Sequence, residues 1–222
     1  MTAPRSITRW SLALLTAGMT ATGWAAPVVF QGAVADRAAF LASVGASASY
    51  TETFESVPIS KDSSHASFTK AGATYTALGG TNVWVASAGY NNYGAGVGTT
   101  TSSNLTANGD EHFEVSLAAA AEVLAMDVYT NGLGPLTISF FNASTLLGSA
   151  SWGASADDIR FLGFKGDQAV TRFEFISTLG GRLNTGLDNI AFASVTGNGV
   201  PEPGTLLLAA SALALVLARR RR

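Results

Sequence analysis

The stretch Val170-Thr-Arg-Phe-Glu-Phe-Ile-Ser177 reads as a β-strand in which Phe173 and Phe175 share one face and fill a core. Other stretches of this kind are also rich in Thr, Val, Ile and aromatic residues and are separated by Gly, Asn and Ser turns. They are residues 50–55, 73–78, 82–86, 112–117, 122–129, 136–141, 159–165 and 187–195. Many short strands without intervening helices predict an all-β fold, an antiparallel β-sandwich.

One segment of this domain departs from strand alternation. Asp36-Arg-Ala-Ala-Phe-Leu-Ala-Ser-Val-Gly45 predicts a short N-terminal helix, which Asp36 can cap and Gly45 can end. Its apolar face would consist of Phe40, Leu41 and Val44. Residues 79–110 are rich in glycine, and we expect long loops there around one or two edge strands. The whole β domain, residues 26–198, is long enough to bury a sizeable core without disulfides.

Composition excludes several classes of function. The chain has 222 residues, with 13 Lys and Arg against 15 Asp and Glu, and its middle is acidic because many basic residues lie at the two ends. Phosphate binding needs clustered cations, so no nucleic-acid partner is expected. The absence of Cys excludes disulfides, thiolate zinc sites and cysteine nucleophiles. His65 and His112 are the only histidines available for metal or triad chemistry.

Residues 1–25 have the organisation of a secretory signal peptide. Arg5 and Arg9 form a basic start, and residues 10–21 form an apolar stretch too short to span a bilayer. Gly23-Trp24-Ala25 then supplies small residues before a cleavage point, with cleavage after Ala26 as the alternative. An uncleaved N-terminal anchor is the other interpretation.

The C-terminus combines a rigid turn, an apolar run and a basic cluster. Val200-Pro201-Glu202-Pro203-Gly204 precedes the uncharged residues 205–218, and Arg219 to Arg222 end the chain. The arginines would stay at the cytoplasmic face by the positive-inside rule. The apolar run is shorter than the ~20 residues that span a bilayer. A marginal transmembrane helix of this kind suits a transient processing signal better than a permanent anchor.

This tail, residues 199–222, resembles the PEP-CTERM sorting signal of Gram-negative bacteria, also described as "ice-binding protein C-terminal domain". The sorting motif is Pro201, Glu202, Pro203 and Gly204, followed by the apolar helix and the terminal arginines. The resemblance implies recognition by an exosortase, a membrane protease-transpeptidase linked to exopolysaccharide systems. An ordinary tail anchor would keep the same topology and lose only the processing.

The middle of the chain resembles the lectin-like and carbohydrate-binding jelly-roll domains that often accompany such tails. The matching pieces are Ile159-Arg-Phe-Leu-Gly-Phe164, Val170-Thr-Arg-Phe-Glu-Phe175 and Leu187-Asp-Asn-Ile-Ala-Phe192, together with the 36–45 opening and Phe54-Glu55. The resemblance implies a jelly-roll sandwich, and a structural calcium between its first and last strands.

The alternation of side chains along the last strand also supports such a metal site. Asp188 would share a face with Ile190 and Phe192, and a carboxylate that points toward a core must find cations or donors. Calcium takes oxygens from carboxylates and carbonyls, so Asp188 with Glu52 or Glu55 is the candidate Ca²⁺ site. In the alternative interpretation, Asp188 lies at the strand rim and bonds to turn amides.

Aromatic residues around the glycine-rich region are the candidates for sugar binding. Trp84, Tyr90, Asn91 and Tyr93 combine rings that can cover the apolar side of a pyranose with an amide that can bond its hydroxyls. The alternative is that Trp84 belongs to the core and the tyrosines close a loop. No motif of a nucleophile elbow or a phosphate-binding loop in its proper context occurs, so no catalytic residue is predicted.

The expected protein is therefore non-enzymatic and exported across the inner membrane of a Gram-negative bacterium. It would be a membrane-associated precursor first, with the export machinery, an exosortase and the inner membrane as partners. It would then act at the cell surface or in the extracellular matrix, where polysaccharide is the candidate ligand. The alternatives are a secreted carbohydrate-active enzyme and a purely structural matrix component.

Overall fold

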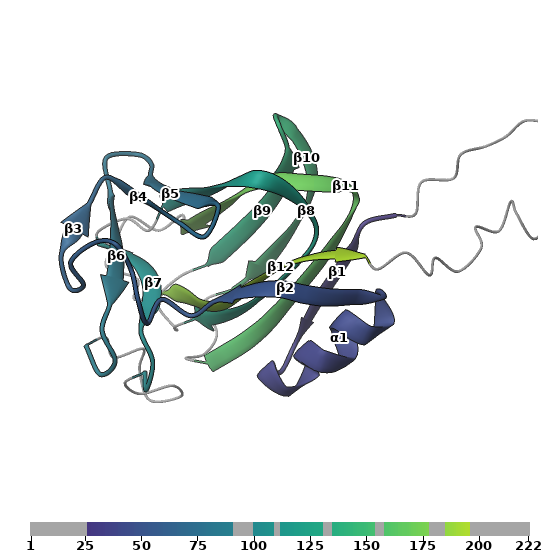
Figure 1. Cartoon of the computed structure of the whole chain (residues 1–222), viewed down its shortest axis with the longest axis horizontal. Coiled ribbons are helices and arrows are strands. Elements are labelled where there is room, and N and C mark those ends of the chain that lie inside the picture. Colours follow the sequence, from purple (N-terminus) through teal and green to yellow (C-terminus); the bar gives the residue numbers. More distant parts are fainter. Residues whose placement is uncertain are drawn as a thin grey trace, which may run out of the picture. The chain divides into compact units, whose positions relative to one another are not determined.

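Two long strands run through the β domain of the computed structural model (Figure 1). Strand β8 spans His112–Thr130, strand β11 spans Asp158–Ser177, and they pair antiparallel along most of their length. The structure describes residues 26–90, 100–108, 112–130, 135–153, 158–177 and 185–195, and residues 24–199 form one compact unit. The other described elements are β1 (Val28–Gly32), η1 (Val34–Asp36), α1 (Arg37–Ser43), β2 (Ala46–Glu52), β3 (Ser64–His65), β4 (Ser67–Lys70), β5 (Ala73–Ala77), β6 (Asn82–Ala86), β7 (Asn104–Asn108), β9 (Leu136–Asn142), β10 (Thr145–Trp152) and β12 (Gly186–Val195).

The two ends of the β8–β11 pair have different neighbours, so the sheet has two halves. In the first half, the end of β8 pairs with β12, which pairs with β2, and the start of β11 pairs with β1. In the second half, the start of β8 pairs with β5, next to β4, and the end of β11 pairs with β9, next to β10. Strands β7, β6 and β3 extend the first half beyond β12. The β8–β11 register shifts on both sides of Val170, where the first half gives way to the second.

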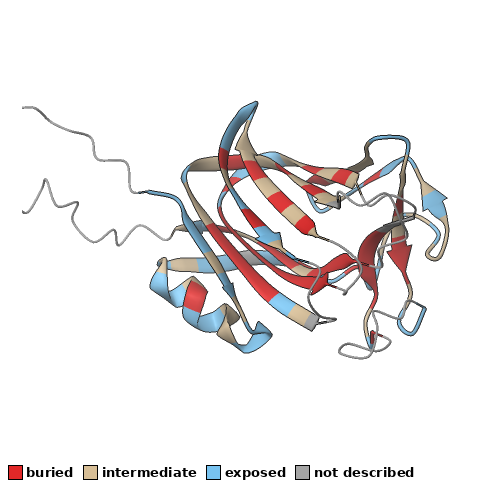
Figure 2. Ribbon diagram, turned by 180° about the vertical axis from the view of Figure 1, so that it is seen from behind, coloured by how far each residue is buried: buried red, intermediate tan, exposed pale blue. Residues whose placement is uncertain are grey.

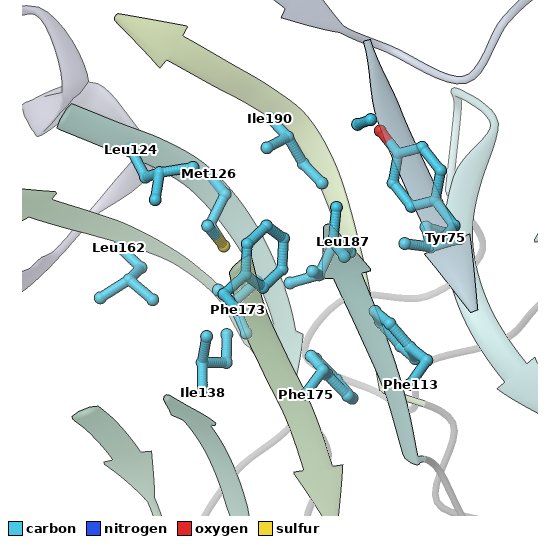
Figure 3. Packing of buried hydrophobic residues seen from close by; sticks show 14 of the residues in the cluster. Tyr75, Phe113, Leu124, Met126, Ile138, Leu162, Phe173, Phe175, Leu187 and Ile190 are labelled. Carbon is cyan, nitrogen blue, oxygen red and sulfur yellow. The ribbon is translucent and has the colours of Figure 1, made fainter. Parts of the chain in front are cut away.

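The two halves enclose one main hydrophobic core. Figure 3 shows Leu124, Met126 and Leu162 of the first half in the same interior as Phe173, Phe175 and Ile138 of the second. Rings of the two halves also meet directly, because Phe164 and Phe140 stack with their centroids 4.0 Å apart. Large buried rings dominate core energetics, so this shared core holds the two halves together.

Helix α1 covers the outer face of the first half (Figures 1 and 2). Phe40 contacts a second buried cluster formed by Val123, Ala125, Phe161, Ala191 and Ala193, and its ring centroid lies 5.7 Å from that of Phe161. Gly163 makes this close approach possible, because a Cβ at that position would lie 2.6 Å from the Phe40 ring. The strands under the helix are consequently buried on both faces.

The expected all-β antiparallel fold with one short helix is confirmed. The helix itself begins at Arg37, and Asp36 caps the preceding turn η1, where its Oδ2 accepts a 2.8 Å hydrogen bond from the Ala33 amide. The predicted segments 112–117 and 122–129 form a single strand, and so do 159–165 and 170–177. Alternation did not predict β1, β3, β4 or β10, whereas β6 and β7 lie in the region expected to hold edge strands.

Candidate functional site

A β-bulge at Asn189 decides which way Asp188 points. Asn189 has φ of 51°, and the β12–β8 register shifts between Asp188 and Ala191. Leu187 and Ile190 consequently both face the main core, while Asp188 lies opposite Asp127 on the outer face. The prediction that Asp188 shares a face with Ile190 and Phe192 is therefore wrong, because the bulge reverses the alternation.

Asp188 is buried, and both of its carboxylate oxygens accept hydrogen bonds from nearby groups. Its Oδ2 accepts hydrogen bonds from the Ser102 hydroxyl at 2.7 Å and from the Tyr129 hydroxyl at 3.5 Å, and its Oδ1 accepts one from the Asn189 amide at 2.7 Å. Burial, assisted by the charges of Asp127 and Glu55, raises the pKa of Asp188 to about 6. Asp188 is thus a satisfied structural carboxylate that retains a proton more readily than an ordinary aspartate.

Asp127 ties the same face to the helix. Its Oδ1 accepts a 2.8 Å hydrogen bond from Arg37 Nη2 in an ion pair, and its Oδ2 accepts one of 2.8 Å from the Asn189 side chain. The Arg37 guanidinium also lies 5.2 Å from the centre of the Phe161 ring. Both carboxylate oxygens of Asp127 are therefore used to fix α1 and the bulge of β12.

Glu52 lies on the inner face, opposite Ile190 in the β2–β12 register. Its Oε1 accepts hydrogen bonds from the Phe54 amide at 2.6 Å and from Lys70 Nζ at 2.7 Å, and its Oε2 accepts one from the Tyr50 hydroxyl at 2.9 Å. Its side chain is fully buried, so the Lys70 partner compensates a charge that would otherwise be costly. This ion pair links β2 of the first half to β4 of the second.

Glu55 is the most exposed of the three candidate ligands. Its Oε1 accepts a 2.9 Å hydrogen bond from the Ser103 amide, and this bond is the main reason why the pKa of Glu55 is lowered. Lys61 Nζ lies 3.7 Å from Oε2. Glu55 therefore anchors the segment before β7.

These three carboxylates do not fit the calcium site that the sequence implied. Glu52 and Asp188 lie on opposite faces of the sheet, and both carboxylate oxygens of Asp188 already accept hydrogen bonds, from Ser102 and from the Asn189 amide. Within the described ranges, no group of three or more Asp, Glu, His or Cys side chains could hold a metal ion.

Trp84 and Tyr90 form a half-exposed aromatic pair. Trp84 faces away from the main core, which receives its neighbours Val83 and Val85, and its ring centroid lies 5.8 Å from that of Tyr90. Tyr90 is 54% exposed. Among the residues that the structure describes, the buried Trp84 Nε1 has no hydrogen-bond partner. Thr106 lies opposite Trp84 on β7, where it is buried and its hydroxyl donates to the Thr185 carbonyl at 2.7 Å.

Other predicted residues lie outside the described part of the chain. They are Asn91 and Tyr93 of the sugar-binding candidates, the sorting motif Pro201, Glu202, Pro203 and Gly204, and the signal peptide at 1–25. In the described residues, no helix combines the length and apolarity that crossing a membrane requires.

A second polar surface was missed by sequence reasoning. It is the outer face of the second half, which we call the open face, and no described helix or strand packs against it. Its side chains lie in rows across β4, β5, β8, β11, β9 and β10, as their registers show. They are Ser67, Thr69, Thr74, Thr76, Glu114, Ser116, Arg172, Glu174, Thr137, Ser139, Phe141, Ser149 and Ser151. The alternation of polar and apolar residues along 112–117, 136–141 and 170–177 was the signal in the sequence that could have revealed this face.

Arg172 lies at the centre of the open face. Its Nη1 donates to Glu114 Oε2 at 2.9 Å and to Glu174 Oε1 at 2.8 Å, and its Nε donates to the Ala143 carbonyl at 3.0 Å. The guanidinium carbon lies 3.8 Å from the centre of the Phe141 ring. A planar cation is thereby fixed in a surface of hydroxyls and carboxylates.

Comparison with known proteins identifies the tail. Residues 199–222 match the PEP-CTERM protein-sorting motif. No curated protein matches the chain.

Several solved domains are distantly similar to the β domain. The K2 cleaved adhesin domain of Lys-gingipain is 15% identical, with a TM-score of 0.41, over 64% of this chain and 96% of that one. A xylan-binding domain of carbohydrate-binding module family 22 is 14% identical, with a TM-score of 0.39, over 69% and 97%. A C-terminal family 22 module from Clostridium thermocellum is 15% identical, with a TM-score of 0.38, over 71% and 98%.

Proposed function

We propose that this chain is a non-enzymatic protein that is exported, sorted to the cell surface through its tail, and binds polysaccharide there. The PEP-CTERM motif at residues 199–222 supports the sorting. An exosortase would recognise Pro201, Glu202 and Pro203 while the apolar run holds the precursor in the inner membrane of a Gram-negative cell. The processed protein would then reside at the surface or in the extracellular matrix.

The aromatic pair Trp84 and Tyr90 carries the ligand proposal. An exposed ring suits a sugar, because the ring can cover the apolar face of a pyranose. The Trp84 ring is half-buried and Tyr90 is 54% exposed, so the pair leaves ring surface on which a sugar can stack. Asn91 and Tyr93 would complete this site.

A glycan array of the intact chain tests the ligand proposal. We expect Trp84→Ala to weaken binding about tenfold, which corresponds to about 1.4 kcal/mol, and Tyr90→Ala to weaken it less. Trp152→Ala is the matched control, because Trp152 is a half-buried tryptophan that packs against the main core elsewhere. Equal binding by the Trp84 and wild-type proteins, both folded, would contradict the site. A wild type that binds no glycan would favour a structural matrix component.

Intact-mass measurement of surface-extracted protein tests the sorting proposal. Glu202→Ala should leave export intact and prevent tail processing, because the change removes the only charge in the Pro-Glu-Pro turn. Export without processing would show as a mass that still includes Arg222. A mature wild-type protein that retains Arg222 would instead favour an ordinary anchor.

The enzymatic alternative needs two accessible carboxylates that face each other. Asp127 and Asp188 are adjacent, but they are only 4% and 1% exposed, and their oxygens are already hydrogen-bonded to Arg37, Asn189 and Ser102. Release of reducing ends from a bound polysaccharide, abolished by Asp188→Asn, would favour the enzyme.

A further inference from the structure

The guanidinium of Arg172 is fixed before any ligand arrives. Three hydrogen bonds, to Glu114, Glu174 and the Ala143 carbonyl, and the ring of Phe141 define its plane. The turn that presents Ala143 is itself fixed, because the Ala143 amide donates to Thr171 Oγ1 at 2.7 Å. A donor held in this way loses little conformational entropy on binding.

One nitrogen and one oxygen of this cluster make no hydrogen bond to the described residues. In the described part of the chain, Arg172 Nη2 and Glu174 Oε2 make no hydrogen bond, whereas Glu114 is occupied by Arg172 and by the Ser116 hydroxyl at 2.7 Å. The side chains of Arg172 and Glu174 are 23% and 30% exposed, so solvent reaches them. A free donor beside a free acceptor matches two neighbouring hydroxyls of a sugar.

Charge and shape around the pair narrow the class of ligand. The single guanidinium is shared by two carboxylates, so an anionic polymer would find no unused cation here. Leu146, which is 56% exposed, lies opposite Phe141 in the β10–β9 register and offers an apolar surface for the C–H face of a sugar ring. The serines and threonines of the open face surround the cluster with groups that both donate and accept.

We propose that Arg172 and Glu174 form a second binding site, on the open face, for a neutral polysaccharide that presents neighbouring hydroxyls. Nη2 donates to one hydroxyl oxygen, and Oε2 accepts from the next hydroxyl. The site shares no residue with the Trp84–Tyr90 pair, and it rests on the proposed function only in the chemical class of the ligand. A protein with both sites can hold two polysaccharide chains at once.

Affinity electrophoresis of the intact chain in gels containing xylan, glucomannan or dextran tests this site. Glu174→Gln retains an acceptor for Arg172 and replaces the free oxygen by a donor, and Arg172→Lys keeps the charge but removes the planar donor. We expect each variant to bind the neutral polymer about tenfold more weakly. Lys165→Arg, a charge-conserving change in the first half, is the matched control and should bind as the wild type does.

The outcomes separate this proposal from the preceding one. Weaker binding by Glu174→Gln with an unchanged melting temperature supports the second site, whether or not Trp84→Ala has an effect. Unchanged binding by both folded variants would overturn it, as would a wild type retarded by none of the neutral polymers. Tighter binding to alginate or chitosan would also overturn it, and so would variants that change only the association of chains in size-exclusion chromatography.

Discussion

The two halves of the sheet share strands β8 and β11 but differ in what lies on their outer faces. In the first half, α1 covers the sheet, and residues 123–130 of β8 are buried without interruption. In the second half no described helix or strand covers the outer face of the sheet, and residues 112–116 of β8 alternate between half-exposed and buried. The same strand therefore changes its sequence pattern where its cover changes. The pattern of apolar residues along a strand therefore indicates whether one or both faces of that strand are covered.

The largest expected effect concerns the core that both halves share. Phe173→Ala and Phe175→Ala should each lower the free energy of unfolding by about 3–5 kcal/mol, because both rings are fully buried and Phe175 stacks on Phe113 with centroids 4.6 Å apart. Urea denaturation followed by circular dichroism measures the loss. If the halves were independent, the transition would separate into two steps, which a single shared core does not allow.

A smaller loss of stability is expected from a change in the first half of the sheet, the half that α1 covers. Gly163→Ala places a Cβ 2.6 Å from the Phe40 ring, so α1 must shift, at a cost of about 1–3 kcal/mol. Phe40→Ala empties the space that this Cβ needs. The double variant should therefore lose less stability than the sum of the two single losses, as a double-mutant cycle in urea can measure. Strict additivity would mean that the helix does not press on Gly163.

The stability contributed by the outer face of the first half should also depend on pH. Burial raises the pKa of Asp188 from 3.8 to about 6, so the folded state binds this proton more tightly than the unfolded state. Stability from this group is complete below about pH 4 and is lost as the pH rises to about 6. Asp188→Asn removes the charge. The advantage of the variant in unfolding free energy should grow through that window, by on the order of 2 kcal/mol.

Urea melts of the two proteins from pH 4 to pH 7 provide this difference directly. The lowered pKa of Glu55 acts with the opposite sign, but it is common to both proteins and cancels. A difference that stays constant across the window would contradict the burial of an ionisable Asp188. Addition of EDTA or Ca²⁺ to the same melts tests the metal, and we expect no shift.

The smallest effect is expected on the open face. Thr76→Val should change the free energy of unfolding by no more than about 0.5 kcal/mol, because the side chain is half-exposed on the outer face. Val115→Thr is the reverse change on the inner face of β8, where the side chain is fully buried. It should cost about 1–3 kcal/mol through a buried hydroxyl. If thermal melts gave the two substitutions equal losses of stability, the open face would have to be as covered as the inner face.

Most of the fold was predictable because the strands obey local rules. Residues 136–141 and 170–177 alternate where one face is open, and 122–129 is apolar where both faces are buried, so composition and period identified them. Strand β10 was missed, because Thr145-Leu-Leu-Gly148 contains an irregularity in its pairing with β9. The register shift at Val170 between the two halves was not predicted either, because it depends on pairing with a strand that is distant in the sequence.

The candidate sites were harder to predict for the same physical reason. One residue in the left-handed region, Asn189, reverses the direction of every later side chain in β12, and Asn tolerates that conformation without any signal in the alternation. The prediction for Asp188 failed there. Arg172 and Glu114 stand far apart in the sequence, and only the β8–β11 register brings them together. Trp84 could be proposed as a candidate from the sequence because an aromatic residue within the alternating segment 82–86 is visible locally.

The pairing of the first strands with the last has a consequence for the order in which the chain folds. Val28 of β1 pairs with Lys165, and Ala46 of β2 pairs with Val195. A ribosome that makes the chain from its N-terminus therefore releases β1 and β2 long before their partners exist. Non-local pairing of this kind also slows folding, since loop closure precedes any gain from contacts. The first two strands thus remain without their sheet partners until nearly the whole β domain has been made.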